Sequence, residues 1–191
     1  MRTDHVCIFY VVLVESEYSA QGIVEDVLTV FLANKECPFR CLMCDLWKNT
    51  TTESVAGGAI PAQIREALTQ RRHARHIKLY NSGNFFDVQA IPSTDYQEIA
   101  ALLTDFETVV VENHPRLCTE RCIVFQQMLN GQLEVAMGLE TSDEETLKYL
   151  NKQMTTADFA NACEFLRSHQ IRIRSFVLLR TPGVTEAKGV E

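Results

Sequence analysis

Three cysteines stand close together in the chain and could bind a metal. Cys37, Cys41 and Cys44 follow the spacing C-x3-C-x2-C. Thiolates are soft ligands that hold both iron–sulfur clusters and zinc. A structural zinc site needs four ligands, usually as paired knuckles, and no second knuckle stands nearby. The spacing therefore favours a 4Fe–4S cluster, in which three cysteines leave one iron free to bind a small molecule. Zinc and three loop cysteines without metal are the alternatives.

The other cysteines suit a protein core. Cys118, Cys122, Phe125 and Leu129 recur at the spacing of one helical stripe, and Cys163 lies on the apolar face of a later helix. Such stripes usually pack inside a protein. The chain has 7 cysteines, so a complete set of disulfides would leave one thiol over. We therefore expect reduced thiols and a cytoplasmic protein.

Strands and helices alternate along most of the chain. Apolar runs predict an N-terminal strand over 6–14 with a turn over 16–22, and then strands over 28–33, 76–80, 108–111, 133–137 and 171–179. Helices are predicted to begin near Pro61, Thr94, Pro115, Thr141 and Thr156, with capping boxes at Thr94/Gln97 and Thr141/Glu144. This alternation indicates βαβ units and a parallel sheet.

The carboxyl ends of parallel strands lie on one side of a sheet, where ligands of α/β proteins bind. The segments that follow the predicted strands should therefore converge. These segments are 34–44, 81–86, 112–114, 138–141 and 180–181. The cysteine motif belongs to the first of them, so the sequence predicts a metal site with polar neighbours from the others.

Charge and hydropathy exclude two classes of protein. The net charge is -7 and the pI is about 5.3, so the chain is not a general binder of nucleic acids, which need clustered Lys and Arg. The basic stretch 71–75 is expected to be a solvated helix end, with RNA contact as the alternative. The apolar run 6–14 is too short to span a membrane. A buried strand explains that run better than a signal peptide, because residues 1–5 include an acid and no convincing cleavage site follows.

The motif and its surroundings resemble a known family. The string FLANKECPFRCLMCDLW, residues 31–47, follows a predicted strand. It is similar to the radical S-adenosylmethionine (SAM) superfamily, and most to the branch of the Elongator catalytic subunit and the archaeosine-biosynthesis radical enzyme. The resemblance runs from about residue 20 to the end. It implies an α/β fold, a partial (βα)6 barrel with parallel strands that stops after the fifth strand of the series. Residues 1–27 would be an N-terminal extension and 28–191 the radical SAM core.

The resemblance also implies two cofactors and their ligands. Cys37, Cys41 and Cys44 would hold a 4Fe–4S cluster, and SAM would chelate the free iron. Further SAM contacts are implied for Met43, Asn81, Ser82, Gly83, Glu112, Glu140 and Lys152. Asn81–Gly83 corresponds to a turn near the SAM amino group, and Glu112 to an acidic position that contacts SAM. Glu140 corresponds to a position near the ribose, Lys152 to an Arg that faces the carboxylate, and Met43 to an aromatic residue beside the adenine.

Several of these residues have an ordinary structural role as the alternative. Glu112 could be a solvated acid at a strand end, and Gly83 a turn glycine. Glu140 could serve the N-terminus of the next helix, and Lys152 could be a surface lysine. His114 is expected at the surface, with substrate contact as its alternative.

The resemblance implies an enzyme that reductively cleaves SAM to a 5′-deoxyadenosyl radical, which abstracts hydrogen from a substrate. Analogy with the branch suggests tRNA or nucleoside modification. The alternatives are a non-catalytic iron–sulfur module for electron transfer or sensing, and an inactive fragment. The expected partners are an external electron donor and a substrate, and a separate C-terminal piece if the protein is split. No membrane contact is expected, and the net charge does not favour nucleic acid.

Overall fold

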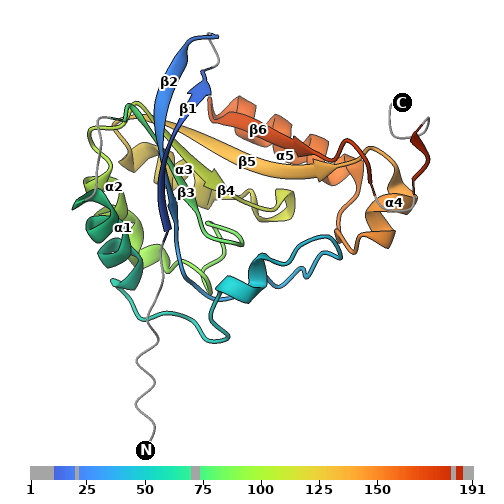
Figure 1. Ribbon diagram of the computed structural model, residues 1–191, viewed down its shortest axis with the longest axis horizontal. Coiled ribbons are helices and arrows are strands. Elements are labelled where there is room, and N and C mark those ends of the chain that lie inside the picture. The colour runs from blue at the N-terminus through green and yellow to red at the C-terminus, as the bar shows by residue number, and fades with distance from the viewer. Residues whose placement is uncertain (1–10, 20–21, 70–73, 182–183, 187–191) are drawn as a thin grey trace, which may run out of the picture.

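The computed structural model describes residues 11–19, 22–69, 74–181 and 184–186. Its strands form a six-stranded sheet in which the order of strands follows the sequence (Figure 1). The strands are β1 (Val11–Tyr18), β2 (Val24–Phe31), β3 (His76–Tyr80), β4 (Thr108–Glu112), β5 (Gln132–Glu140) and β6 (Arg172–Val177). β2 to β6 pair in parallel, while β1 pairs antiparallel with β2. The predicted α/β class with a parallel sheet is confirmed, and the sheet is open, with β1 and β6 at its edges.

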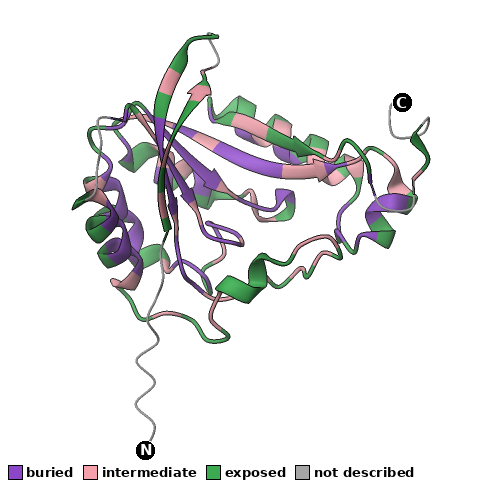
Figure 2. Cartoon of the chain, viewed as in Figure 1, coloured by how far each residue is buried: buried purple, intermediate pink, exposed green. Residues whose placement is uncertain are grey.

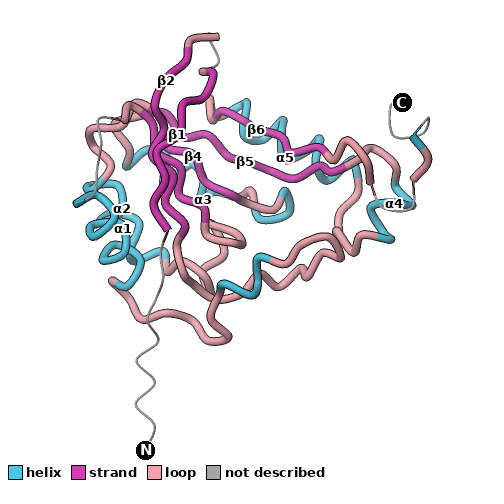
Figure 3. The backbone as a smooth tube through the Cα atoms, in the orientation of Figure 1, coloured by secondary structure: helices cyan, strands magenta, loops and turns pink. Residues whose placement is uncertain are grey.

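Helices connect the parallel strands. They are α1 (Ala59–Thr69), α2 (Tyr96–Leu102), α3 (Glu120–Met128), α4 (Glu144–Tyr149) and α5 (Thr156–Ser168). Short 3-10 helices cover Leu46–Asn49, Ser93–Asp95 and Pro115–Leu117. Figure 3 shows the long loop that carries the three cysteines between β2 and α1. Within the described residues, no helix combines the length and apolar character needed to cross a membrane.

The N-terminal strand continues past its predicted end at residue 14. Ser16 belongs to β1 rather than to a turn, and β2 begins at Val24 rather than at residue 28. The hairpin pairs along its whole length, from Val11 opposite Phe31 to Tyr18 opposite Val24, so pairing overrides the apolar pattern. Residues 6–10 of the predicted strand lie outside the described residues.

Other predicted boundaries also move. The helix expected from Pro115 splits into a 3-10 helix and α3, because Cys118 and Thr119 are extended between them. β5 continues through an irregularity to Glu140 instead of ending at Gly138, and β6 covers 172–177 instead of 171–179. The predicted terminator of that strand, 182–183, lies outside the described residues.

Neither predicted capping box forms. Asp95 precedes α2 and binds the Gly58 N–H, and Asp143 caps α4 by accepting a hydrogen bond from the Thr146 N–H. A capping box does form at α5, between Thr155 and Asp158. Asp143 thus takes the place predicted for Thr141, whereas the Asp95 side chain makes no capping bond to α2.

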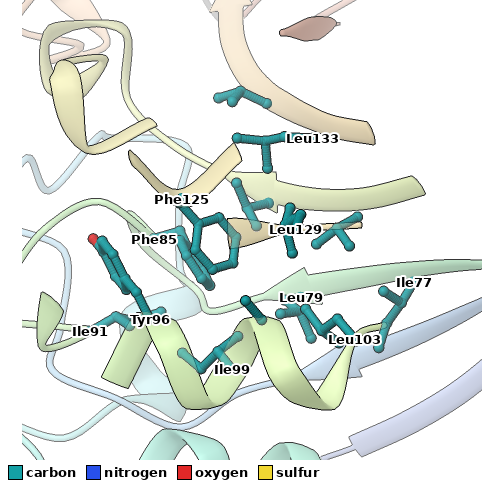
Figure 4. Packing of buried hydrophobic residues seen from close by; sticks show 14 of the residues in the cluster. Ile77, Leu79, Phe85, Ile91, Tyr96, Ile99, Leu103, Phe125, Leu129 and Leu133 are labelled. Carbon is teal, nitrogen blue, oxygen red and sulfur yellow. The ribbon is translucent and has the colours of Figure 1, made fainter. Parts of the chain in front are cut away.

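One face of the sheet packs against the helices. Aliphatic side chains of β2 to β5 meet α1, α2, α3 and α5 in one continuous core, shown in purple in Figure 2. Figure 4 shows Phe85, Tyr96 and Phe125 in this core, where the Phe85 and Phe125 ring centroids are 4.9 Å apart. Cys122 is fully buried there, and Cys118 and Cys163 pack against the cluster. Their predicted place in the core is confirmed.

The other face of the sheet carries an ionic network. Glu17 of β1 pairs with Lys78 of β3 and, at 3.2 Å, with Arg174 of β6. Arg174 also pairs with Glu134 of β5 at 2.6 Å. β1 and β6 are the two edges of the sheet, so the sheet curls until its edge strands touch through side chains. Arg75, from the predicted basic stretch, pairs with Glu25 and Glu107, while residues 71–73 lie outside the described part.

Candidate functional site

A cavity of about 190 Å³ lies at the carboxyl ends of the parallel strands. Most of the residues predicted for the site line it. They are Cys37, Cys41, Met43, Cys44, Ser82, Gly83, Glu112, Glu140 and Lys152. The loops after β2, β3, β4 and β5 thus converge as predicted, whereas residues 180–181 do not contribute to the lining.

Asn81 lies beside this cavity rather than in its lining. Its side chain is fully buried, and neither its amide oxygen nor its amide nitrogen has a hydrogen-bond partner among the described residues. A Cβ on Gly83 would lie 3.7 Å from the Asn81 Nδ2 and 3.6 Å from the Cys37 Cβ. A buried amide without partners is rare, so the turn beneath the cysteine loop has unfilled hydrogen-bonding capacity.

The cysteine loop is held by the turn that follows α4. The Leu42 N–H donates to the Leu150 carbonyl at 2.8 Å. The Phe39 carbonyl accepts from the Asn151 Nδ2 at 3.0 Å and from the Gln153 Nε2 at 2.9 Å. Asn151 and Gln153 both have positive φ angles, near 53°, so this turn holds an uncommon backbone conformation. Two segments far apart in sequence therefore fix the shape of the motif.

His114 packs against the cysteine loop. It is buried, and the prediction that it lies at the surface is wrong. Its ring stacks on the Phe39 ring at a centroid distance of 3.7 Å. Its Nδ1 accepts from the Arg116 N–H, so its Nε2 carries the proton and donates to the Lys152 carbonyl at 2.9 Å. Burial lowers the pKa of His114 to about 4, and the positive charge of Lys152 acts in the same direction. The imidazole is therefore neutral near pH 7.

Glu112 lies at the end of β4 and faces the turn after β3. Its carboxylate accepts a hydrogen bond from the Asn81 N–H at 3.2 Å. Burial raises the pKa of Glu112 to about 7, although bonds from the backbone of Asn81 and Ser82 oppose this shift. A carboxyl group that titrates near neutral pH inside a cavity is typical of functional sites.

Glu140 and Lys152 form a buried ion pair across the cavity wall. The Lys152 Nζ donates to the Glu140 Oε1 at 2.8 Å, and both side chains are buried. The pair fills the space above Gly138, where a Cβ would lie 2.1 Å from that oxygen and 2.6 Å from that nitrogen. A side chain at position 138 would therefore displace the ends of the Glu140 and Lys152 side chains. The sequence did not predict that these two residues would bind each other.

Among the further lining residues, four polar or aromatic ones from the strand-end segments were missed or misplaced by the sequence analysis. They are Phe39, Asn84, Asn113 and His114. Each lies inside a segment that was predicted to converge, so position at a strand end is the signal that could have found them. Which side chains of a segment face the cavity depends on tertiary contacts, and position at a strand end does not reveal these.

No protein-family model matches the chain. Archaeosine synthase subunit beta of Methanosarcina acetivorans is 25% identical over 89% of this chain and 53% of its own length. The same-named protein of Thermococcus kodakarensis is 26% identical over 79% of this chain and 49% of its own length. The uncharacterized protein MJ0550 of Methanocaldococcus jannaschii is 24% identical over 85% of this chain and 49% of its own length. The chain spans about half the length of the curated relatives it matches.

A solved structure has a similar fold. It is the cobalamin-dependent S-adenosylmethionine radical enzyme OxsB with aqua-cobalamin and S-adenosylmethionine bound. The TM-score is 0.56, and the sequences are 13% identical over 86% of this chain and 29% of that chain. The fold of the chain resembles that of this radical SAM enzyme, and its sequence resembles archaeosine synthase subunit beta. At this identity the structural likeness is one of fold. The resemblance predicted from the cysteine motif is thereby confirmed.

The likeness to radical SAM enzymes raises the question of whether the residues of the cavity fit a 4Fe–4S cluster. Cys37, Cys41 and Cys44 line one cavity, and burial raises the pKa of the Cys37 and Cys41 thiols. Within the described ranges, no three Cys, His, Asp or Glu side chains converge closely enough to hold a metal ion. Each cysteine of a cluster binds a different iron, so three separated thiols around a cavity suit a cluster better than one zinc ion.

Proposed function

We propose that this chain is a radical SAM enzyme in which Cys37, Cys41 and Cys44 hold a 4Fe–4S cluster. Such a cluster, once reduced, supplies the electron that cleaves SAM to methionine and a 5′-deoxyadenosyl radical for hydrogen abstraction. The observation that carries this proposal is that all three cysteines of the motif line one cavity at the carboxyl ends of the parallel strands. No fourth cysteine lines that cavity among the described residues, which favours an open iron over an electron-transfer module.

The charged residues of the cavity are proposed to bind the ends of SAM. Lys152 provides a buried positive charge for a carboxylate, and Glu140 keeps that charge compensated when no ligand is present. Glu112, with a pKa of about 7, can bind an ammonium group as a carboxylate and a hydroxyl group in either protonation state. The sulfur of Met43 and the ring of Phe39 offer apolar contact in the same cavity. Ser82 and Gly83 are proposed to approach the amino group through their backbone.

The relatives suggest a substrate class and a partner. Two of them carry the name archaeosine synthase subunit beta. By that likeness we propose that the chain acts on a nucleoside or tRNA base together with a second subunit, and that it receives electrons from an external donor. Reduced thiols favour the cytoplasm as its location. We propose that residues 28–191 form the radical SAM core and that 1–27 extend it at the N-terminus.

The production of 5′-deoxyadenosine tests the proposed function. The protein is reconstituted anaerobically with iron and sulfide, and SAM and dithionite are then added. We expect wild type to form 5′-deoxyadenosine, and Cys41→Ala to lose that activity at least a hundredfold, because a cluster ligand is removed. Cys163→Ala is the matched control, since Cys163 packs against the core away from the cavity.

The control and the variant separate the outcomes. The proposal holds if wild type and Cys163→Ala produce 5′-deoxyadenosine and Cys41→Ala does not. A reconstituted cluster that leaves SAM intact would instead support the electron-transfer module. Equal production by Cys41→Ala and wild type would contradict the assignment of the ligands.

A further inference from the structure

The Asn84 side chain joins the cysteine loop to the turn after β4. Its Nδ2 donates a hydrogen bond to the Cys37 sulfur at 3.2 Å, and its Oδ1 accepts from the His114 N–H at 2.7 Å. A backbone N–H can only donate, so the bond from His114 identifies the oxygen end of this amide. The NH2 end must therefore face the sulfur. Asn84 is 3% exposed, so the solvent does not compete for either bond.

His114, which orients the Asn84 side chain, is itself held by several contacts. The His114 ring is stacked on Phe39, and its two nitrogens bind the Arg116 N–H and the Lys152 carbonyl. Phe39 lies between Cys37 and Cys41 in the motif. Asn84 thus contacts the cysteine loop directly at Cys37 and, through His114, at Phe39. These contacts fix the position of its NH2 donor. Such fixed surroundings are what a metal ligand needs to hold one orientation.

We propose that Asn84 is a positioning residue for the cluster of the proposed function, on which this inference rests: its hydrogen bond fixes the Cys37 sulfur and raises the reduction potential of a cluster held there. Reduction adds one electron, whose charge is spread onto the cysteine sulfurs. A hydrogen-bond donor stabilises the more negative form more than the less negative one. Hydrogen bonds to the sulfurs are one of the terms that set cluster potentials.

A redox titration of the reconstituted protein tests this role. The reduced cluster is measured by electron paramagnetic resonance while dithionite and mediators set the potential. Asn84→Ala removes both bonds, and Asn84→Asp keeps an acceptor for the His114 N–H but loses the donor to sulfur. Asn161→Ala is the control, because Asn161 is exposed on α5 and does not line the cavity. Iron and sulfide per chain are measured for every protein.

We expect both Asn84 variants to have a lower midpoint potential than wild type. At the wild-type midpoint, the ratio of reduced to oxidised cluster should fall roughly tenfold in Asn84→Ala, which for one electron equals about 59 mV. The midpoint potential of Asn161→Ala should equal that of wild type. A folded Asn84 variant that binds no cluster while Asn161→Ala binds one would also support the positioning role.

Two results would overturn the inference, and they are distinguishable. If wild type and both Asn84 variants carry a cluster of equal potential, Asn84 has no such role and the proposed function is unaffected. If wild type itself binds no cluster under these conditions, the proposed function fails and the inference fails with it.

Discussion

The Glu112 carboxyl group connects the site to the pH dependence of folding. Its pKa is raised to about 7 in the folded chain from an ordinary value of 4.5. Between these values the folded state binds a proton that the unfolded state has released. The free energy of unfolding therefore falls as the pH rises through this window, and the contribution of Glu112 is fully present only below pH 4.5.

Glu112→Gln should remove this dependence. Relative to wild type, the free energy of unfolding of the variant is expected to rise by roughly 3 kcal/mol between about pH 4.5 and pH 7.5. Urea unfolding at a series of pH values measures the difference. Glu98→Gln, at an exposed helix position, is the control. A difference between Glu112→Gln and wild type that does not change with pH would show that Glu112 is not buried as described.

His114 changes the free energy of unfolding with pH in the opposite direction. The effect of Glu112 is therefore measured as the difference between Glu112→Gln and wild type. Its pKa falls to about 4 on folding from an ordinary value of 6.5. The stability due to the neutral imidazole is present above pH 6.5 and is lost as the pH falls through 4. In wild type the contributions of Glu112 and His114 to the pH dependence of the free energy of unfolding partly cancel between pH 4.5 and 6.5.

At the residue scale, the sequence predicted what depends on local spacing. The cysteine motif needs only eight consecutive residues, 37–44, so it could be found without a structure. His114 could not, because its burial depends on Phe39 and on the Lys152 carbonyl, which are distant in sequence. The ion pair of Glu140 with Lys152 was missed for the same reason.

At the scale of elements, the turn after α4 acts as a clamp on the cysteine loop. Asn151 donates to the carbonyls of Phe39 and Arg40, and Gln153 donates to that of Phe39. Asn151 also has a positive φ angle, which an Asn adopts more readily than an Ala. These contacts hold the thiols partly buried before any cluster is bound.

Asn151→Ala should loosen this clamp. We expect the thiols of Cys37 and Cys41 to react several-fold faster with iodoacetamide in the metal-free protein, because exposure removes the burial that raises the pKa of both thiols. Mass spectrometry of the alkylated peptides gives each rate. Asn161→Ala, at an exposed position of α5, should leave both rates unchanged. Unchanged rates in Asn151→Ala would mean that the loop keeps its shape without the clamp.

The order of the elements could be predicted better than their ends. β3 occupies the predicted residues, 76–80, because its apolar run is bounded by polar residues on both sides. The hairpin of β1 and β2 could not be placed, since its register comes from pairing along both strands rather than from hydropathy. The missed capping box at α4 shows that an Asp next to a helix start competes with a nearby Thr.

At the scale of the whole molecule, β1 at one edge of the sheet contacts β6 at the other edge through side chains. Glu17 contacts Lys78 and Arg174, and Lys78 is 5% exposed, so Glu17 compensates a buried charge. Figure 1 shows β1 crossing close to β2 at one side of the open sheet, with β6 at the other end of the strand order. The side chains of β1 therefore hold together a sheet whose backbone does not close.

Glu17→Gln should destabilise the protein measurably. The neutral amide removes the carboxylate that pairs directly with Lys78 and leaves only its longer-range interactions with Glu15 and Glu134, while burial already lowers the pKa of that lysine. We expect the free energy of unfolding to fall by about 2 kcal/mol at pH 7. The control Glu98→Gln breaks an exposed pair with Arg65 and should change it by less than about 0.5 kcal/mol. Equal effects of the two substitutions would rule out a special role for β1.

The central claim is that the cavity holds a 4Fe–4S cluster with one iron open to SAM. The most direct test is the electron paramagnetic resonance spectrum of the reconstituted, dithionite-reduced protein, recorded before and after addition of SAM. We predict a cluster signal that changes when SAM is added, persists in Cys163→Ala and disappears in Cys41→Ala. A cluster signal that SAM does not alter, or a protein that binds no iron, would contradict the account.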